Sequence, residues 1–199
     1  LDEVSEFLKC DCQDCFFDLL CPELNLDGVV YFFRNAFEPV LKQIQNYFEP
    51  LYATIATAMC LESVEGPILN VLKKCYQNNW KKIYAKWFTE NRHRAVMKAL
   101  QGTLKLADGV DDTVNEEITT FIEKLSLICF KMYISDPWLV FDLSLMGQKV
   151  ANNPVKMDSM DGFVKNGQDS LIILPSVHKS NVESEPLIKP NVLPLDYEF

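Results

Sequence analysis

The sequence has few of the residues on which most enzyme and nucleotide sites depend, since its 199 residues include two histidines and seven glycines. His93 lies in a basic stretch and His178 in a proline-flanked tail, and neither stands in a catalytic or metal-binding motif. None of the glycines forms a run that cradles phosphate at a helix start. The sequence therefore predicts a non-enzymatic protein with no cofactor. A Cys129–His178 pair assembled by the fold is the alternative that spacing alone leaves open.

Excess positive charge is also lacking, because the chain carries a net charge of −9. Neutralising nucleic-acid phosphates needs a surplus of lysine and arginine, so we expect no nucleic-acid partner. The charges are unevenly spread, however. Residues 1–28 hold eight carboxylates against Lys9 alone, and residues 73–98 hold eight lysines and arginines against Glu90 alone. This separation of acidic and basic residues along the chain requires a structural or functional reason.

Long apolar runs are absent, and no run approaches the roughly 18 residues of a membrane span or resembles a secretory signal. The seven cysteines are an odd number, which favours a reducing, intracellular compartment. The first residue is Leu1 rather than methionine, so we expect the chain to be part of a longer protein.

The composition is that of a folded domain, because 48% of the residues are hydrophobic and 12% are aromatic. Apolar residues spaced three and four apart predict helices up to residue 135. Pro22 should end the first helix, Pro39 should kink or break the second, and Thr113 with Glu116 has the spacing of a capping box. The predicted helices span residues 2–21, 27–48, 51–61, 66–87, 92–106 and 113–132.

After Asp136 the helical periodicity disappears and five prolines follow Pro137. Short β-prone runs at 138–143 and 170–174 are separated by turn signals. The predicted fold class is mainly α, a multi-helix bundle with a small irregular β element at the C-terminus. We expect a helical bundle over 1–135 with residues 136–199 packed on it, the two forming one structural domain.

Four cysteines near the start of the chain could form a structural zinc site, because closely spaced thiolates are its usual ligands. Helical geometry favours another interpretation: residues 10 and 12 point to nearly opposite faces, while residues 12 and 15 share the apolar stripe. We therefore expect buried, reduced cysteines and keep zinc as the weaker alternative. The four residues are Cys10, Cys12, Cys15 and Cys21.

The most informative segment for function is a basic, aromatic helix near the middle of the chain. Aromatic rings and lysines on one helix can sit at an anionic bilayer surface. The same pattern also fits a core helix whose aromatic residues are buried and whose lysines face solvent or pair with the acidic first helix, and both descriptions can hold together. The candidate contacts for lipid or an acidic partner are Lys74, Lys81, Lys82, Lys86, Arg92, Arg94, Trp80 and Trp87.

The last third of the chain carries two sequence markers. One is a helix with Phe121, Ile122, Leu125, Phe130 and Met132 that leads into an acidic-Pro step at 136–137. The other is an apolar strand closed by proline, 173–175, followed by an acidic hairpin and a second strand at 187–189. With these markers the segment resembles the C-terminal domain of the mitochondria-eating protein family. That family tends to carry Trp and Gly where this chain has Leu174 and Pro190, so the chain resembles a divergent member.

The resemblance implies a role in mitochondrial quality control and mitophagy. It implies a cytoplasmic protein associated with the mitochondrial outer membrane, with a domain that engages anionic phospholipid such as cardiolipin or a protein partner. The residues leave a second function open, a scaffold module that self-associates. In that case the acidic first helix of one copy would meet the basic helix of another in a salt-dependent homo-oligomer.

Overall fold

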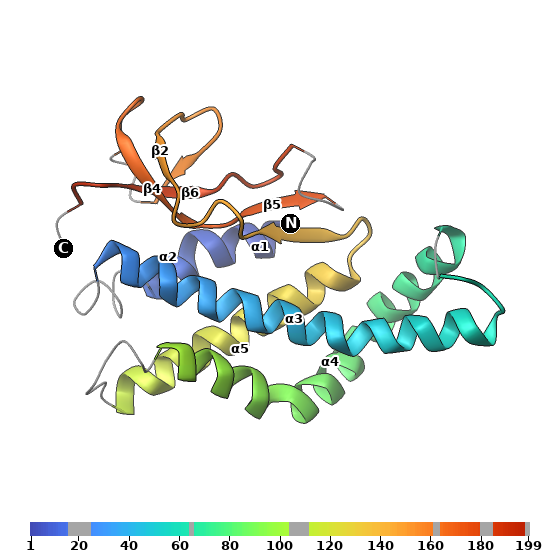
Figure 1. Cartoon of the computed structure of the whole chain (residues 1–199). Helices are drawn as coiled ribbons and strands as arrows, with labels where there is room; N and C mark the ends of the chain where they lie inside the picture. Colours follow the sequence, from blue (N-terminus) through green and yellow to red (C-terminus); the bar gives the residue numbers. More distant parts are fainter. Residues whose placement is uncertain (16–24, 64–65, 104–111, 161–163, 180–184, 198–199) are drawn as a thin grey trace.

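The computed structural model describes residues 1–15, 25–63, 66–103, 112–160, 164–179 and 185–197, without the side chains of 66–67, 90–103 and 112–115. Three long helices form a layer, and the strands and the N-terminal helical segments lie against one side of it (Figure 1). In chain order the helical segments are α1 (Asp2–Glu6), the π-helical turn η1 (Phe7–Asp11), α2 (Cys12–Asp14), α3 (Leu26–Ala58), α4 (Gly66–Thr103) and α5 (Asp112–Ile134).

Helix α3 runs without interruption through Pro39 and Pro50, so it does not break at Pro39, and the predicted separate helix at 51–61 is wrong. A proline inside a helix costs about 3 kcal/mol. Against this, each large apolar side chain that becomes buried contributes about 1.5–3 kcal/mol, and the inner face of α3 buries a continuous series of them. Pro39 is half-buried and Pro50 exposed, so neither proline replaces a fully buried residue of that face.

The end of α3 is closed by backbone hydrogen bonds, although no glycine marks it. Cys60 adopts φ = 57°. Its N–H donates to the carbonyl of Thr57 at 3.1 Å, and the N–H of Leu61 donates to the carbonyl of Ala56 at 2.8 Å. These two bonds form a Schellman motif, which glycine usually completes. Helix α3 therefore ends three residues before the predicted end at 61.

Helix α4 is also longer than predicted, because the expected helices at 66–87 and 92–106 are one continuous segment. The predicted end near 106–109 lies outside the described residues. Helix α5 begins at Asp112, one residue before the predicted cap Thr113, and runs to Ile134. The predominance of helix up to residue 135 is thus confirmed.

The C-terminal part forms two sheets and is more regular than the small irregular element that was predicted. β1 and β5 pair as an antiparallel ribbon, and the other strands form a sheet in the order β2-β4-β6-β3. The predicted strands at 138–143 and 170–174 correspond to β1 and β4, whereas in the predicted strand at 187–189 only Ile188 makes a bridge, to Val177. The strands are β1 (Leu139–Asp142), β2 (Lys149–Ala151), β3 (Asp158–Ser159), β4 (Asp169–Leu174), β5 (Ser176–Lys179) and β6 (Asn191–Pro194).

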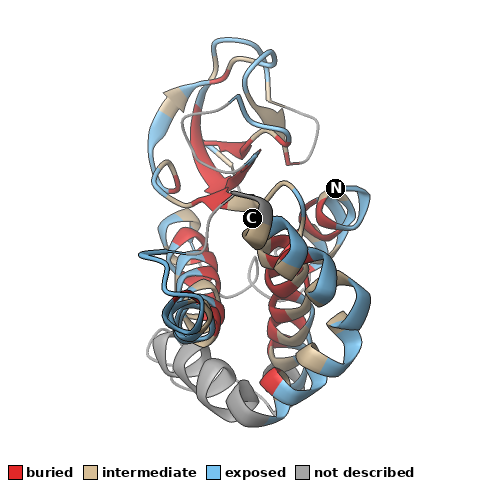
Figure 2. Ribbon diagram, turned by 90° about the vertical axis from the view of Figure 1, so that its right-hand side faces the viewer, coloured by how far each residue is buried: buried red, intermediate tan, exposed pale blue. Residues whose placement is uncertain are grey.

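One hydrophobic core joins the helices to the strands. Buried residues line the inner sides of the helices and the strands that face them, while the outward sides are exposed (Figure 2). Phe37 of α3 contacts Phe141 of β1 edge-to-face, with ring centroids 5.0 Å apart. Phe48 of α3 lies where α3, α4 and α5 meet. The division at residue 135 into bundle and extension stays a prediction.

Candidate functional site: the basic face of α4

The inner side of α4 is held by aromatic packing. The Tyr76 ring lies 5.3 Å from Phe48 of α3, and the rings of Tyr84 and Trp87 lie 5.2 and 5.7 Å from Phe130 of α5. These residues recur at the spacing of one helical stripe. The core interpretation of the aromatic residues therefore describes the inner side of α4 correctly.

As far as residue 89, the outer side of α4 carries lysines and no carboxylate. The sequence from 66 to 89 contains no aspartate or glutamate, and four of its five lysines are exposed. They share one side of the helix with Cys75, Asn78 and Asn79, which are exposed too. We call this surface the basic face of α4, and its lysines are Lys74, Lys81, Lys82 and Lys86.

The two tryptophans among the predicted contacts have different positions. Trp87 is 1% exposed, so its ring belongs to the core and is not available on the surface. Trp80 is half-buried at the edge of the basic face. The Nζ atoms of Lys131 and Lys81 lie 4.8 and 5.8 Å from the centroid of its ring, within the range of cation–π attraction. Arg92 and Arg94 continue along α4, but their side chains lie outside the described residues.

The fifth lysine, Lys73, has a structural position. It is buried, and its Nζ lies 4.3 Å from the centroid of the Trp138 ring. Desolvation by burial lowers the pKa of Lys73, and the charge of Asp136 acts in the opposite direction. One turn further along, Gln77 Nε2 donates to the carbonyl of Ile134 at 3.0 Å. These contacts fix α4 against the end of α5 and leave the basic face turned outward.

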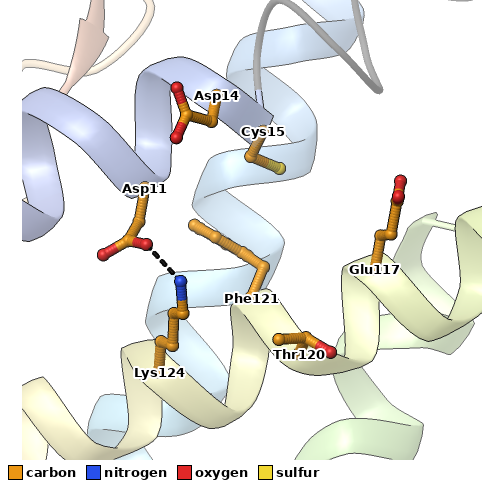
Figure 3. A pocket seen from close by; sticks show the side chains of 7 residues that line it. All are labelled: Asp11, Asp14, Cys15, Glu117, Thr120, Phe121 and Lys124. Atoms are coloured by element: carbon orange, nitrogen blue, oxygen red, sulfur yellow. Dashed lines mark hydrogen bonds and ion pairs between the residues drawn. The ribbon is translucent and has the colours of Figure 1, made fainter.

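The acidic N-terminal segment pairs with α5. Lys124 pairs with Asp11, and Lys131 Nζ lies 2.7 Å from Glu3 Oε2. Figure 3 shows the Asp11–Lys124 pair at the edge of a cavity of about 220 Å³ between this segment and α5, with Phe121 on its floor. The sequence analysis named the lysines of α4 as possible partners of the acidic first helix, and it missed Lys124 and Lys131. Their spacing of seven residues, which places both on one side of α5, was the available signal.

The N-terminal cysteines separate between core and surface. Cys12 and Cys15 are buried on the apolar stripe as predicted, whereas Cys10 is exposed, so the expected burial is wrong for Cys10. Cys21 lies outside the described residues. Burial, with smaller contributions from Cys15, Asp11 and Cys129, raises the pKa of the Cys12 thiol well above its ordinary value. Within the described part of the chain, no group of three or more His, Cys, Asp or Glu side chains could hold a metal ion.

Cys129 and His178 are both buried, in α5 and β5 respectively. Burial raises the pKa of the Cys129 thiol, which disfavours the thiolate that nucleophilic catalysis requires. The Nε2 atom of His178 lies 2.8 Å from Oγ of Ser176, two residues away on the same strand. The environment of Cys129 is that of a structural core cysteine.

No helix in the described ranges has both the length and the apolar character that crossing a bilayer requires. Comparison of the chain with protein-family models, curated proteins and solved structures finds no match. The resemblance to the mitochondria-eating protein family therefore stays a prediction, and the function is argued from the basic face of α4.

Proposed function

We propose that this chain is a non-enzymatic interaction domain that binds anionic phospholipid through the basic face of α4. The observation that carries the proposal is the group of exposed lysines on a helix whose sequence has no carboxylate from 66 to 89. Each lysine close to anionic headgroups contributes about 1 kcal/mol, so four together can hold a domain at a membrane. The resemblance adds the expected setting, the outer mitochondrial membrane during mitochondrial quality control, with cardiolipin as the leading lipid.

Exposed apolar side chains after the end of α3 and in the second turn of α4 favour a bilayer over an acidic protein surface. Met59 and Leu61 lie in the turn that joins α3 to α4, and Val71 lies in the second turn of α4. Their exposed fractions are 50%, 40% and 60%. Interfacial membrane binding combines apolar burial with attraction between lysines and lipid headgroups. Lys74 lies one turn beyond Val71, and Lys81, Lys82 and Lys86 lie roughly 15–23 Å beyond it along the helix, so the two kinds of contact combine where α4 lies along the membrane surface.

Co-flotation with liposomes tests the proposal. We expect the purified chain to float with cardiolipin-containing vesicles at low salt, to float less at physiological salt, and to stay in the soluble fraction with neutral phosphatidylcholine vesicles. Salt weakens the binding because the Debye length falls from about 30 Å at 0.01 M to about 8 Å at 0.15 M. Equal flotation with neutral and anionic vesicles would contradict a site built on lysines.

Self-association is the second candidate function, and the same conditions separate it from lipid binding. It would place the acidic first helix of one copy on the basic face of another. Two of the carboxylates involved, Glu3 and Asp11, pair with α5 in their own chain, which leaves the acidic helix with less charge for a second copy. Sedimentation without vesicles measures this candidate: a salt-sensitive dimer would support it, and a monomer at every salt concentration would remove it.

A further inference from the structure

Lys131 of α5 lies between the acidic N-terminal segment and the edge of the basic face of α4. Its Nζ atom is 2.7 Å from Oε2 of Glu3 in α1 and 4.8 Å from the centroid of the Trp80 ring in α4. Lys81 of the basic face lies beside the same ring, with its Nζ 5.8 Å from the centroid. Two lysines from different helices therefore lie next to one half-buried indole ring.

The position of Lys131 on α5 explains why it reaches both neighbours. Phe130 packs on Tyr84 of α4, and Phe121 stacks on Phe7 of the N-terminal segment, with ring centroids 5.2 and 5.6 Å apart. An α-helix turns by about 100° per residue, so Phe130 points about 100° to one side of Lys131 and Phe121 about 80° to the other. Lys131 thus lies on the ridge of α5 between its two packing partners, and 27% of its side chain is exposed.

Glu3 is a counter-ion that a ligand can replace. Its side chain is 64% exposed, and such ion pairs contribute little to stability because water solvates both partners. The buried side chains of Phe7 and Leu8 hold the N-terminal segment in place, so the Glu3 carboxylate can leave Lys131 while the segment stays folded. A phosphate oxygen accepts the charge-assisted hydrogen bond of a lysine as a carboxylate oxygen does.

We propose that Lys131 is part of the lipid-binding surface and that a lipid phosphate replaces Glu3 as its partner at the membrane. Lys131 and Lys81 then contact lipid phosphates next to Trp80, whose amphipathic ring suits the boundary between headgroups and acyl chains. Because the phosphate has to displace Glu3, this residue weakens membrane binding. The inference rests on the proposed membrane function and adds a lysine of α5 to the four of the basic face.

Vesicle affinity of the whole chain with Glu3→Gln tests the inference. The affinity is read from the concentration of cardiolipin-containing vesicles at which half of the chain floats at physiological salt. We expect it to rise by about fivefold, which corresponds to one more lysine near the headgroups. Glu6→Gln is the matched control, because it removes the same charge from another exposed residue of α1. It should change the affinity by less than about twofold, since screening weakens distant charges.

Lys131→Gln shows whether the effect of Glu3 passes through Lys131. In this background we expect Glu3→Gln to raise the affinity no more than Glu6→Gln does, because Glu3 then has no lysine to occupy. Equal gains from Glu3→Gln and Glu6→Gln in the parent chain would overturn the inference, as would an undiminished Glu3→Gln gain without Lys131. Both results would leave lipid binding by the basic face intact, whereas a parent chain that never floats would refute the proposed function itself.

Discussion

Reversing Lys81, Lys82 and Lys86 to glutamate is expected to abolish flotation with cardiolipin-containing vesicles. Losing three lysines at about 1 kcal/mol each lowers the binding constant by roughly a hundredfold, and repulsion between the new carboxylates and the headgroups lowers it further. All three side chains are exposed, so the fold should survive the change. Flotation at physiological salt measures the bound fraction in the parent, the variant and the control, and circular dichroism verifies the helical content.

A control variant shows whether vesicle binding depends on the lysines of α4 or on the net charge of the chain. Reversing Lys149, Lys156 and Lys165, which are exposed in the C-terminal β region, gives the same net charge, since three reversals change −9 by −6 to −15 in both variants. The control should keep most of its binding, because screening confines the attraction to about 8–10 Å at physiological salt. Equal loss in the two variants would mean that net charge, and not the basic face of α4, governs binding.

Phe48→Ala is expected to destabilise the chain by about 3–5 kcal/mol, the usual cost of removing a large buried ring. Phe48 is fully buried, and its ring centroid lies 4.9 Å from that of Tyr133, 5.3 Å from Tyr76 and 5.5 Å from Phe130. These partners belong to α4 and α5, so the substitution leaves a cavity where α3, α4 and α5 meet. Thermal unfolding followed by circular dichroism should show a melting temperature lower by roughly 6–20 °C.

Tyr31→Ala is the matched comparison for Phe48→Ala, because Tyr31 is an aromatic residue on the exposed side of the same helix. We expect it to change stability by less than about 1 kcal/mol. A Phe48→Ala chain that melts within a degree or two of the parent would show that this junction does not hold the three helices together.

The helical part of the fold could be predicted from the sequence, but its boundaries could not. Apolar spacing identified helical structure up to residue 135, because burying a stripe of side chains is what stabilises a surface helix. The prediction ended this helix at 48 and began another after Pro50 because proline rules are local, whereas the buried stripe that outweighs the proline extends along the whole helix. Strands as short as β2 and β3 have no periodicity to detect, and pairing with β4 and β6 creates them.

The candidate site was predictable in part. The lysines of α4 and the absence of carboxylates from 66 to 89 are visible in the sequence. Trp87 is buried because its ring packs on Phe130 of another helix. The sequence around Trp87 carries no information about that contact. The same limit hid the pairs of Lys124 and Lys131 with the N-terminal segment, which join residues more than a hundred positions apart. Long-range contacts therefore decide which members of an amphipathic pattern reach the surface.

The most direct test of the central claim measures the reactivity of Cys75, which is exposed on the basic face of α4. A chain with Cys10, Cys21 and Cys60 replaced by serine keeps Cys75 as its reporter, since Cys12, Cys15 and Cys129 are buried. A sister chain that keeps Cys10 and has the other three replaced is the control.

The alkylation rate by a neutral polyethylene-glycol maleimide is compared with and without cardiolipin-containing vesicles. We predict that vesicles slow the labelling of Cys75 by about tenfold or more, because a covered thiol is inaccessible to the reagent, and leave Cys10 unchanged. Full vesicle binding with an unchanged Cys75 rate would contradict the account, because the membrane would then be bound by another surface.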